Sequence, residues 1–422
     1  MSTFFRIWKT PEVRKSLLFV VCMLVIFRVA AHIPIPGIDA SAIKSLFEGN
    51  TFFGLLNIFS GGTMENFSVV ALGIAPYITS SIIFQLLAMI IPSLEEMQKE
   101  EQGRQKINQY TRYLTVPLAL LQAYALIILL TQQSGVQLFA DHATFMIILS
   151  IICLTAGTIF LMWIGELISE KNVGNGISIL IFAGIIAGIP TFLQQIFAVY
   201  DYSQLVTLIL FIAVTVATIV GIVVMNEAQR NIPVRYARQM RGSRLSGAVN
   251  SHIPLRLNMG GVIPIIFAIS LILLPGMVAQ FFLNARTEIL REAAQWTIQL
   301  FQNQLFYGIF YFIMVFAFAY FYTAVIFHPD QMAENLQKQG GFIPGIRPGK
   351  NTSDYLGAVV NRLLLTGASF LALIAVLPLI VQQFTGTANM VIGGTSILII
   401  VAVLIDSVKQ VESQLMMHEY DL

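Results

Sequence analysis

The chain has 422 residues, of which 56% are hydrophobic and 11% are charged, and its formal net charge is +2. Soluble domains carry about 25% charged residues, so this composition, with a mean hydropathy of +0.77, excludes an ordinary soluble protein and indicates a membrane protein. The two cysteines, Cys22 and Cys153, lie in apolar segments and predict no disulfide framework.

Apolar segments suited to crossing a bilayer recur ten times along the chain. The first follows a basic start and resembles a signal peptide, but Arg28 interrupts it and further spans follow, so we interpret it as a retained span. An even number of spans places both ends of the chain on the same side of the membrane. The predicted spans are 16–33, 69–91, 113–131, 143–168, 176–197, 205–225, 257–283, 301–327, 356–381 and 392–410.

Basic residues gather on one side of the membrane in this arrangement. Of the 24 lysines and arginines, 20 fall at the N-terminus, in alternate loops or at the end of the tenth span, three fall on the other side, and Arg28 lies within a span. Because basic loops stay on the cytoplasmic side, this bias predicts cytoplasmic termini. It also predicts long cytoplasmic loops at 226–256 and 328–355.

The segment 34–68 differs from the other loops because it is too long for a simple turn. Its apolar part, 52–68, is too short to cross a bilayer, and Gly61-Gly62 would break a helix. Non-helical backbone at membrane depth requires shelter by protein or by a water-filled cavity. We predict a short re-entrant or interfacial segment on the outer side, with an ordinary surface loop as the alternative.

The ten spans divide into two halves of five, 1–200 and 201–410, followed by a short tail at 411–422. Five is odd, so the two halves would enter the membrane from opposite sides, as an inverted repeat does. A G-x-x-P pattern occurs in the second span of each half, at Gly73–Pro76 and at Gly261–Pro264. Glycine and proline interruptions at matching positions point to a central pathway in repeat-built transport proteins.

The sequence lacks the residues of an enzyme or an ion-coupled carrier. No acidic residue falls in the middle of a predicted span, and the histidines fall at span ends or in loops. No nucleotide-binding motif, nucleophile motif or metal-ligand spacing occurs, so neither a catalytic residue nor a cofactor or metal site is predicted. A passive or externally driven pathway remains, which an apolar constriction can gate by dewetting. The alternatives are a small-solute secondary transporter built on inverted repeats, and an insertase or scaffold without a pore.

Eight stretches, in order and across nearly the whole chain, resemble the SecY family of bacterial protein-translocase channel subunits. They are IFRVAAHIPIPGID (26–39), FSGG (59–62), ALGIAPYITSSIIFQLL (71–87), QYTRY (109–113), LMWIGELISEKNVGNGISILIFAGIIAG (161–188), IPLRLNMGGVIPIIFA (253–268), FYTAVIFHPDQMAENLQKQGGFIPGIRPGKNT (321–352) and GGTSILI (393–399). The resemblance implies an all-α polytopic membrane protein with ten transmembrane helices in two inverted five-helix halves around a central hourglass pore. The implied function is a protein-conducting channel that translocates unfolded secretory proteins across the bacterial cytoplasmic (inner) membrane and inserts membrane proteins laterally into it.

The resemblance also implies roles for individual residues. The pore ring corresponds to Ile74, Ile78, Ile177, Ile181, Ile266 and Ile399. The plug, near 57–68, includes Asn57, Ile58, Phe59, Ser60, Gly61, Gly62, Thr63 and Met64. The lateral gate lies between spans two and three and spans seven and eight, whose polar positions are Thr79, Ser80, Gln85, Gln122 and Ser270. Taken alone, these isoleucines could equally face lipid, and the polar residues could simply join neighbouring helices.

The cytoplasmic loops carry the residues that the resemblance assigns to docking of the SecA motor ATPase or of the ribosome and its RNA. These are Arg230, Arg235, Arg238, Arg241, Arg244, Arg347 and Lys350. Proline and glycine fix the turns of GGFIPGIRPGKNTSDY (340–355), and arginine binds phosphate and carboxylate groups through its forked donors. The alternative is that these charges only set topology and contact anionic lipids. The resemblance further implies the small membrane subunits SecE and SecG as partners, with signal sequences and nascent chains as cargo.

Three positions depart from the family pattern. His32 stands where an aromatic residue is common, Gln105 replaces part of a basic pair, and the C-terminal tail is short. None of these departures falls at the predicted pore ring, and Gln105 and the short tail bear on the strength of the cytoplasmic contacts.

Overall fold

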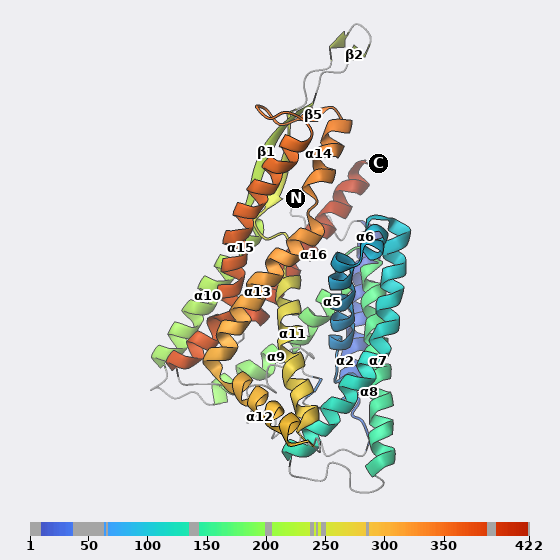
Figure 1. Ribbon diagram of the computed structural model, residues 1–422, viewed down its shortest axis with the longest axis vertical. Helices are drawn as coiled ribbons and strands as arrows, with labels where there is room; N and C mark the ends of the chain where they lie inside the picture. Colours follow the sequence, from blue (N-terminus) through green and yellow to red (C-terminus); the bar gives the residue numbers. More distant parts are fainter. Residues whose placement is uncertain are drawn as a thin grey trace.

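The computed structural model describes residues 10–36, 63–64, 66–134, 143–198, 205–236, 240–241, 244–245, 250–283, 287–385 and 394–420. A helix stands at each of the ten predicted spans, and most of these helices run along the long axis of the molecule (Figure 1). They are α2 (Pro11–Ala31), α5 (Ala75–Ile90), α7 (Glu101–Ser134), α8 (Ala143–Ser169), α9 (Gly176–Ala198), α10 (Leu205–Glu227), α11 (Ile263–Phe282), α13 (Gln304–Ile326), α15 (Lys350–Thr385) and α16 (Gly394–Tyr420).

Within the described residues, five helical stretches are each long and apolar enough to cross a membrane. These are Glu101–Ile128, Thr144–Ser169, Leu208–Glu227, Gln304–Lys338 and Lys350–Val381. A sixth arises if α5 and α6 (Pro92–Lys99), which are bent by 108° at their junction, are taken as one broken span. Shorter apolar stretches occur at Gly176–Pro190 and Ile263–Gly276. The chain is therefore a multi-pass membrane protein.

The two G-x-x-P patterns mark the starts of helices α5 and α11. Gly73 and Gly261 both have φ of +58°, in the left-handed region that favours glycine. Each helix begins two residues later with a proline in its second position, where the missing backbone N–H breaks no helical hydrogen bond. The predicted match between the halves is thus present in the backbone, at the N-terminal end of a helix.

A second pair of glycines repeats one helix contact in both halves. A methyl group on Gly157 of α8 would overlap the backbone carbonyl of Val69, and one on Gly367 of α15 would lie 2.5 Å from the carbonyl oxygen of Leu257. Val69 and Leu257 each stand four residues before the left-handed glycine of their half. The helices α8 and α15 occupy the fourth place in their respective halves. This repeated close contact supports an internal structural repeat.

Buried apolar side chains form three clusters. The central cluster joins both halves and contains, among others, Val20, Ile78, Leu161, Ile181, Ile266, Val315, Ala372 and Leu398. The second cluster belongs to the first half and consists of Ile35, Met64, Phe67, Ala71, Leu72, Ala123, Leu126, Ile127, Leu130 and Leu154, with partly buried neighbours. The third cluster lies under the long loops and consists of Ile232, Val234, Leu255, Leu336, Ile343, Leu356, Val359 and Val360, again with partly buried neighbours.

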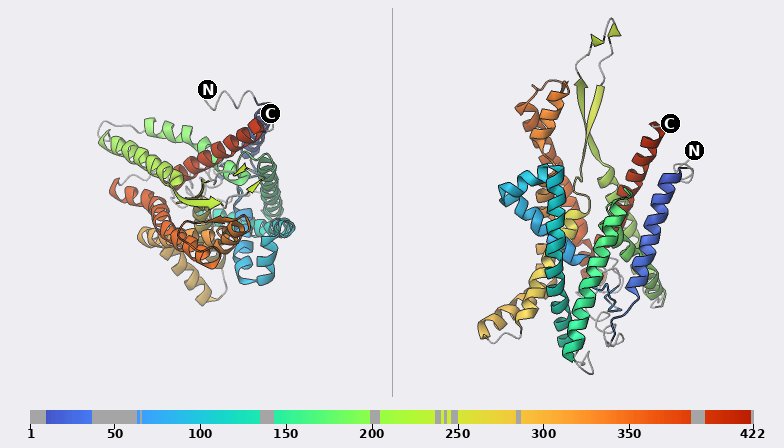
Figure 2. Two further views of the ribbon diagram at one scale, coloured as in Figure 1. Left: turned by 90° about the horizontal axis from the view of Figure 1, so that it is seen from above. Right: turned by 90° about the vertical axis from the view of Figure 1, so that its right-hand side faces the viewer.

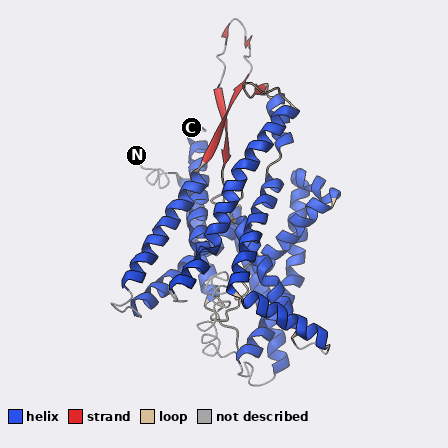
Figure 3. Ribbon diagram, turned by 60° about the vertical axis from the view of Figure 1, so that its left-hand side comes forward, coloured by secondary structure: helices blue, strands red, loops and turns tan. Residues whose placement is uncertain are grey.

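The predicted loop 226–256 contains β-strands that sequence analysis did not anticipate. Strand β1 (Gln229–Tyr236) pairs antiparallel with β4 (Asn250–Arg256), and β5 (Gly341–Phe342) adds to the other edge of β1. Strands β2 (Met240–Arg241) and β3 (Arg244–Leu245) pair farther along the hairpin, which projects beyond the helices (Figure 3). Ile232 and Val234 are buried between exposed neighbours. This alternation with a period of two is typical of a strand, but it is short and was not used to predict one.

The start of α2 and the end of α16 both lie toward the end of the molecule that carries the hairpin (Figure 2). Helix α14 (Pro329–Lys338) stands at this end too, whereas α12 (Glu288–Gln302) lies at the opposite end (Figure 1). The two ends are therefore distinct: one carries the basic loops, and the other carries α12.

Candidate functional site

The six isoleucines of the predicted pore ring all belong to the central cluster. Ile74, Ile78, Ile181, Ile266 and Ile399 are buried, and Ile177 is partly buried against the same cluster. They come from the N-terminal ends of four helices, α5, α9, α11 and α16. These helices belong to both halves of the chain. The structure therefore places all six isoleucines in the apolar cluster that joins the two halves.

Four of these isoleucines form two pairs related by the internal repeat. Counted from the left-handed glycines, Ile78 and Ile266 occupy equivalent positions. Helices α9 and α16 begin with the matching sequences GISILI (176–181) and GTSILI (394–399), which makes Ile181 equivalent to Ile399. The S-I-L-I that the two stretches share is the sequence signal for this pairing, which the predicted ring did not use.

The start of α9 is fixed by polar contacts with α8. Asn175 caps the helix, because its Oδ1 accepts hydrogen bonds from the backbone N–H of Ile177 at 3.1 Å and of Ser178 at 3.2 Å. Ser169 Oγ donates to the carbonyl of Gly165 and accepts from the N–H of Gly176, both at 2.9 Å. Only glycine fits at 176, where a Cβ would overlap the Gly165 carbonyl. These contacts set the position of the Ile177 and Ile181 backbone.

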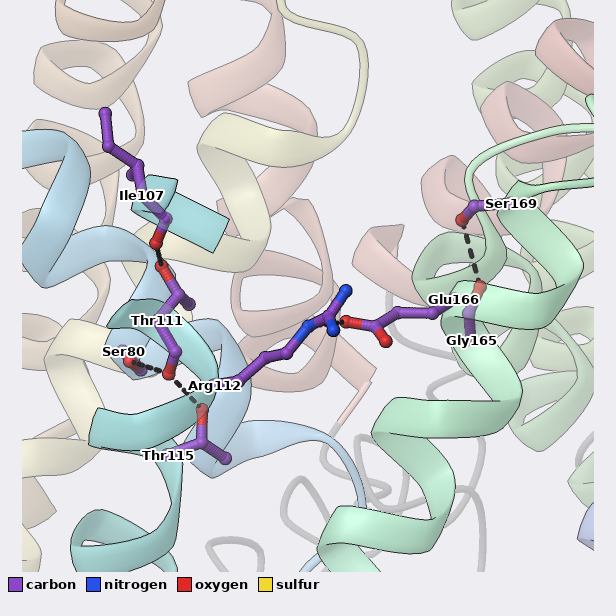
Figure 4. Close-up of polar contacts among 8 residues, drawn as sticks. All are labelled: Ser80, Ile107, Thr111, Arg112, Thr115, Gly165, Glu166 and Ser169. Carbon is purple, nitrogen blue, oxygen red and sulfur yellow. Dashed lines mark hydrogen bonds and ion pairs between the residues drawn. The ribbon is translucent and has the colours of Figure 1, made fainter. Parts of the chain in front are cut away.

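In the predicted lateral gate, α11 of the second half packs against α5 and α7 of the first half, and α13 packs against α11. The hydrogen bonds of its polar residues stay within one half of the chain. Ser80 Oγ donates to the carbonyl of Thr111 on α7 at 2.7 Å (Figure 4), and Gln85 Nε2 donates to Ser81 Oγ at 3.1 Å. Thr79 and Ser270 donate to carbonyls of their own helices, and Gln122 of α7 is buried. These bonds stabilise each side of the predicted gate and do not join the two sides.

A cavity of about 810 Å³ opens between the halves near the hairpin end of α5. Its first-half lining comes from α5, α6 and α7, and its second-half lining comes from the end of α13 and the start of α14. Gln85 lines this cavity, and its Oε1 is buried without a hydrogen-bond partner. Lys99, Arg104 and His328 line it as well. The seam between the halves thus has a polar cavity at this end and an apolar contact farther in.

Of the predicted plug, residues Asn57, Ile58, Phe59, Ser60, Gly61 and Gly62 lie outside the described residues. Thr63 and Met64 are described and buried. The Thr63 carbonyl accepts from both the N–H and the Oγ of Ser68 at 3.2 Å, and Thr63 Oγ1 donates to the carbonyl of Val70. Met64 packs in the second cluster, which includes residues of α7 and α8. The C-terminal end of the predicted plug is therefore fixed to the first half.

The two long loops form a single unit at the hairpin end. Pairing of β1 with β5 sets Arg235 opposite Phe342, and the third cluster packs beneath both loops. Arg230 and Arg235 on β1 are exposed. Arg238 lies outside the described residues, and for Arg241 and Arg244 only the backbone is described, on β2 and β3.

Arg347 stands exposed on a turn that is fixed from both sides. Gly345 and Gly349 adopt φ of +84° and +98°, and Thr352 Oγ1 donates to the Arg347 carbonyl at 3.0 Å. Lys350, also exposed, is the first residue of α15. Because the third cluster holds both loops together, the exposed basic residues of β1 and of this turn belong to one rigid surface.

An ion pair ties α7 to α8 near the same end. Arg112 Nε lies 2.6 Å from Glu166 Oε1 (Figure 4). A second pair, Lys409 with Glu227 at 2.8 Å, joins α16 to α10. Among the described residues no three His, Cys, Asp or Glu side chains lie close enough to hold a metal ion.

Comparison with known proteins identifies the family. The family model described as SecY matches residues 68–408. The protein translocase subunit SecY of Streptomyces coelicolor is 42% identical, over 100% of this chain and 99% of the relative. A solved structure described as "The structure of a protein conducting channel" has a TM-score of 0.64 at 18% identity, over 94% of this chain and 91% of that one. Sec61 in the canine ribosome-channel complex has a TM-score of 0.62 at 17% identity, over 94% and 91%. The chain belongs to the SecY family.

Proposed function

We propose that this chain is the protein-conducting channel of a bacterial Sec translocase. It passes unfolded secretory proteins across the cytoplasmic membrane and releases apolar segments sideways into the bilayer. The observation that carries this proposal is that six isoleucines from four helix ends in both halves, five of them buried and one partly buried, belong to one cluster. Its relatives bear the name of translocase subunits, and one of its structural neighbours is described as a protein-conducting channel.

The isoleucine contact acts as the seal. An apolar constriction resists wetting and so holds back ions without any charged residue. Isoleucines hold one another by dispersion alone, at about 0.1–0.2 kcal/mol per atom pair. Such a contact parts for an extended polypeptide and re-forms behind it without breaking hydrogen bonds. The plug corresponds to residues near 57–68.

The seam between α5 and α7 of the first half and α11 and α13 of the second half acts as the lateral gate. The hydrogen bonds of Thr79, Ser80, Gln85 and Ser270 stay within one half, so opening the seam leaves them intact. Lipid tails are as apolar as the helix surfaces, so little hydrophobic free energy opposes separation of the helices. An apolar segment of the translocating chain can therefore leave the seam for the lipid with little change in free energy, because it finds apolar contacts in both places.

Partners supply the energy and complete the complex. No nucleotide-binding motif is present, so the SecA motor or a translating ribosome drives the movement. SecE clamps the two halves, and SecG is the third subunit. The exposed arginines of β1 and of the Arg347 turn bind acidic surfaces of the motor or ribosomal RNA phosphates. The structural neighbour in a ribosome-channel complex supports ribosome docking. Anionic lipids contact the same basic loops.

The hairpin end faces the cytoplasm, and both termini lie there. The bias of basic residues and the shared end of α2 and α16 support this orientation. Proteoliposomes that hold this chain with SecE and SecG test the proposal. Addition of SecA, ATP and an unfolded secretory precursor is expected to yield protease-protected precursor. No protection, with the complex intact, would contradict the channel function.

A further inference from the structure

Helix α12 (Glu288–Gln302) has three distinct faces. The first packs on the protein: Ala294 is buried and Phe301 packs against the central cluster. The second is polar, and the third is apolar yet exposed. The polar face consists of Glu288, Arg291, Glu292, Gln295 and Gln299. The exposed apolar face consists of Ile289, Ala293 and Trp296, and the half-buried Leu300 follows at the same helical spacing.

The exposed apolar face is too large to be left in water. Ile289 is 80% exposed and Trp296 is 64% exposed. Apolar surface is unfavourable in water, so two such large side chains on one face indicate a covering phase or partner. The helix lies at the end of the molecule opposite the hairpin. It extends sideways from the C-terminal end of α11 and the N-terminal end of α13 (Figure 2).

Helix α12 is fastened to α13 by aromatic contacts. The ring of Phe301 meets those of Phe306 and Phe310 edge-to-face, each with centroids 5.7 Å apart. Asn303 caps α13, since its Oδ1 accepts from the backbone N–H of Leu305 at 3.1 Å. These contacts fix the junction between α12 and α13. An interaction that holds α12 in place therefore also holds the N-terminal end of α13.

The surroundings of α12 favour lipid as the covering phase. Leu305 and Ile309 of α13, with Val278 and Phe282 of α11, are exposed apolar residues of helices that this membrane protein presents to the bilayer. The exposed face of α12 continues this surface at the point where the helices end. Tryptophan is enriched at the boundary between headgroups and acyl chains, because its ring is apolar and its N–H is polar.

We propose that α12 is an interfacial anchor that lies in the outer leaflet, with Ile289 and Trp296 inserted at the boundary between headgroups and acyl chains. Its charged residues are two glutamates and one arginine, so apolar insertion holds it and attraction to anionic headgroups does not. The anchor fixes the outer ends of α11 and α13, which form the second-half side of the proposed gate. The proposal rests on insertion of the chain in a membrane and is independent of the channel function.

The fluorescence of Trp296 tests the anchor. The chain has three tryptophans, so Trp8→Phe with Trp163→Phe leaves Trp296 as the only one. This full-length chain is reconstituted in phosphatidylcholine vesicles with bromine at defined depths along the acyl chain, with and without phosphatidylglycerol. We expect short-wavelength emission, strongest quenching by bromine near the headgroup end, and the same quenching with either lipid composition.

A matched control places the probe on the polar face of the same helix. In a chain with Trp8→Phe, Trp163→Phe and Trp296→Phe, Gln295→Trp is expected to emit at long wavelength and to be quenched by acrylamide from water. Three results for Trp296 would overturn the proposal: quenching by acrylamide alone, short-wavelength emission without bromolipid quenching, which indicates a protein partner, or strongest quenching by bromine at the chain ends. Bromolipid quenching of the Gln295→Trp probe would overturn the assignment of faces.

Discussion

Replacing the two equivalent glycines Gly157 and Gly367 with alanine is expected to destabilise both halves in the same way. At Gly367 the new Cβ would lie 2.5 Å from the Leu257 carbonyl oxygen, and ordinary contacts begin at 3.4 Å. Helix α15 would therefore have to move by about 1 Å against backbone, as α8 would at Gly157. Overpacking of this kind costs about 1–3 kcal/mol.

The helical preference of alanine offsets part of this cost, by about 1 kcal/mol. The matched control is Gly188→Ala in α9, where a Cβ meets no atom within 4 Å, so that only the helical gain applies. Relative to this control, Gly157→Ala and Gly367→Ala should each lose about 1–3 kcal/mol. Thermal unfolding of the purified variants, under identical lipid and detergent conditions, measures the difference as a lower midpoint. Two variants as stable as Gly188→Ala would refute the repeated close contact.

Three further predictions concern single contacts. Arg347→Glu should depress SecA-driven translocation while membrane insertion and thermal stability stay normal, because the side chain is exposed; unchanged translocation would remove its docking role. Asn175→Ala should lower stability by about 1 kcal/mol through loss of the α9 cap and raise ion leak, and Asn175→Asp should restore both. Ser80→Ala should cost only about 0.6 kcal/mol, because the Thr111 carbonyl keeps its hydrogen bond from Thr115 at 2.7 Å. A loss of several kcal/mol for Ser80→Ala would show that the polar network of Figure 4 holds α5 more tightly than these contacts imply.

The helices and their order were predictable because spans are read from composition. An apolar run long enough to cross a bilayer forms a helix, since no other local structure satisfies the backbone there. The two G-x-x-P patterns were also informative, because a backbone φ of +58° favours glycine, and glycine can be recognised in the sequence. The sequence did not predict that these patterns start helices. The residues before and after each helix start are equally apolar, so composition does not locate the boundary.

The sheet at the hairpin end was not predicted, for a different reason. The strand β1 has a short alternation, Ile232 and Val234, and its partner β5 lies more than a hundred residues away. Pairing over such a distance depends on tertiary packing, here the third cluster. The same holds for the gate: the sequence marks Ser80 as polar, and only the fold gives its partner, Thr111 on the same side of the seam.

The candidate site was assigned through resemblance and not through the residues alone. Any single isoleucine in a span, such as Ile266, has no property that separates it from one facing lipid. The fold adds what the sequence lacks, since it gathers the six isoleucines into one cluster at four helix ends. The repeat of S-I-L-I in 176–181 and 394–399 was the one local signal that could have paired Ile181 with Ile399.

Ion conductance of the reconstituted channel tests the central claim, that the six isoleucines form the seal. The variant replaces Ile74, Ile78, Ile177, Ile181, Ile266 and Ile399 with serine. The matched control replaces six exposed isoleucines, Ile148, Ile152, Ile209, Ile212, Ile309 and Ile313, with serine. The seal variant should leak ions in planar bilayers without any partner, and the control should stay closed. Equal conductance of the two variants, with both correctly folded, would contradict the account.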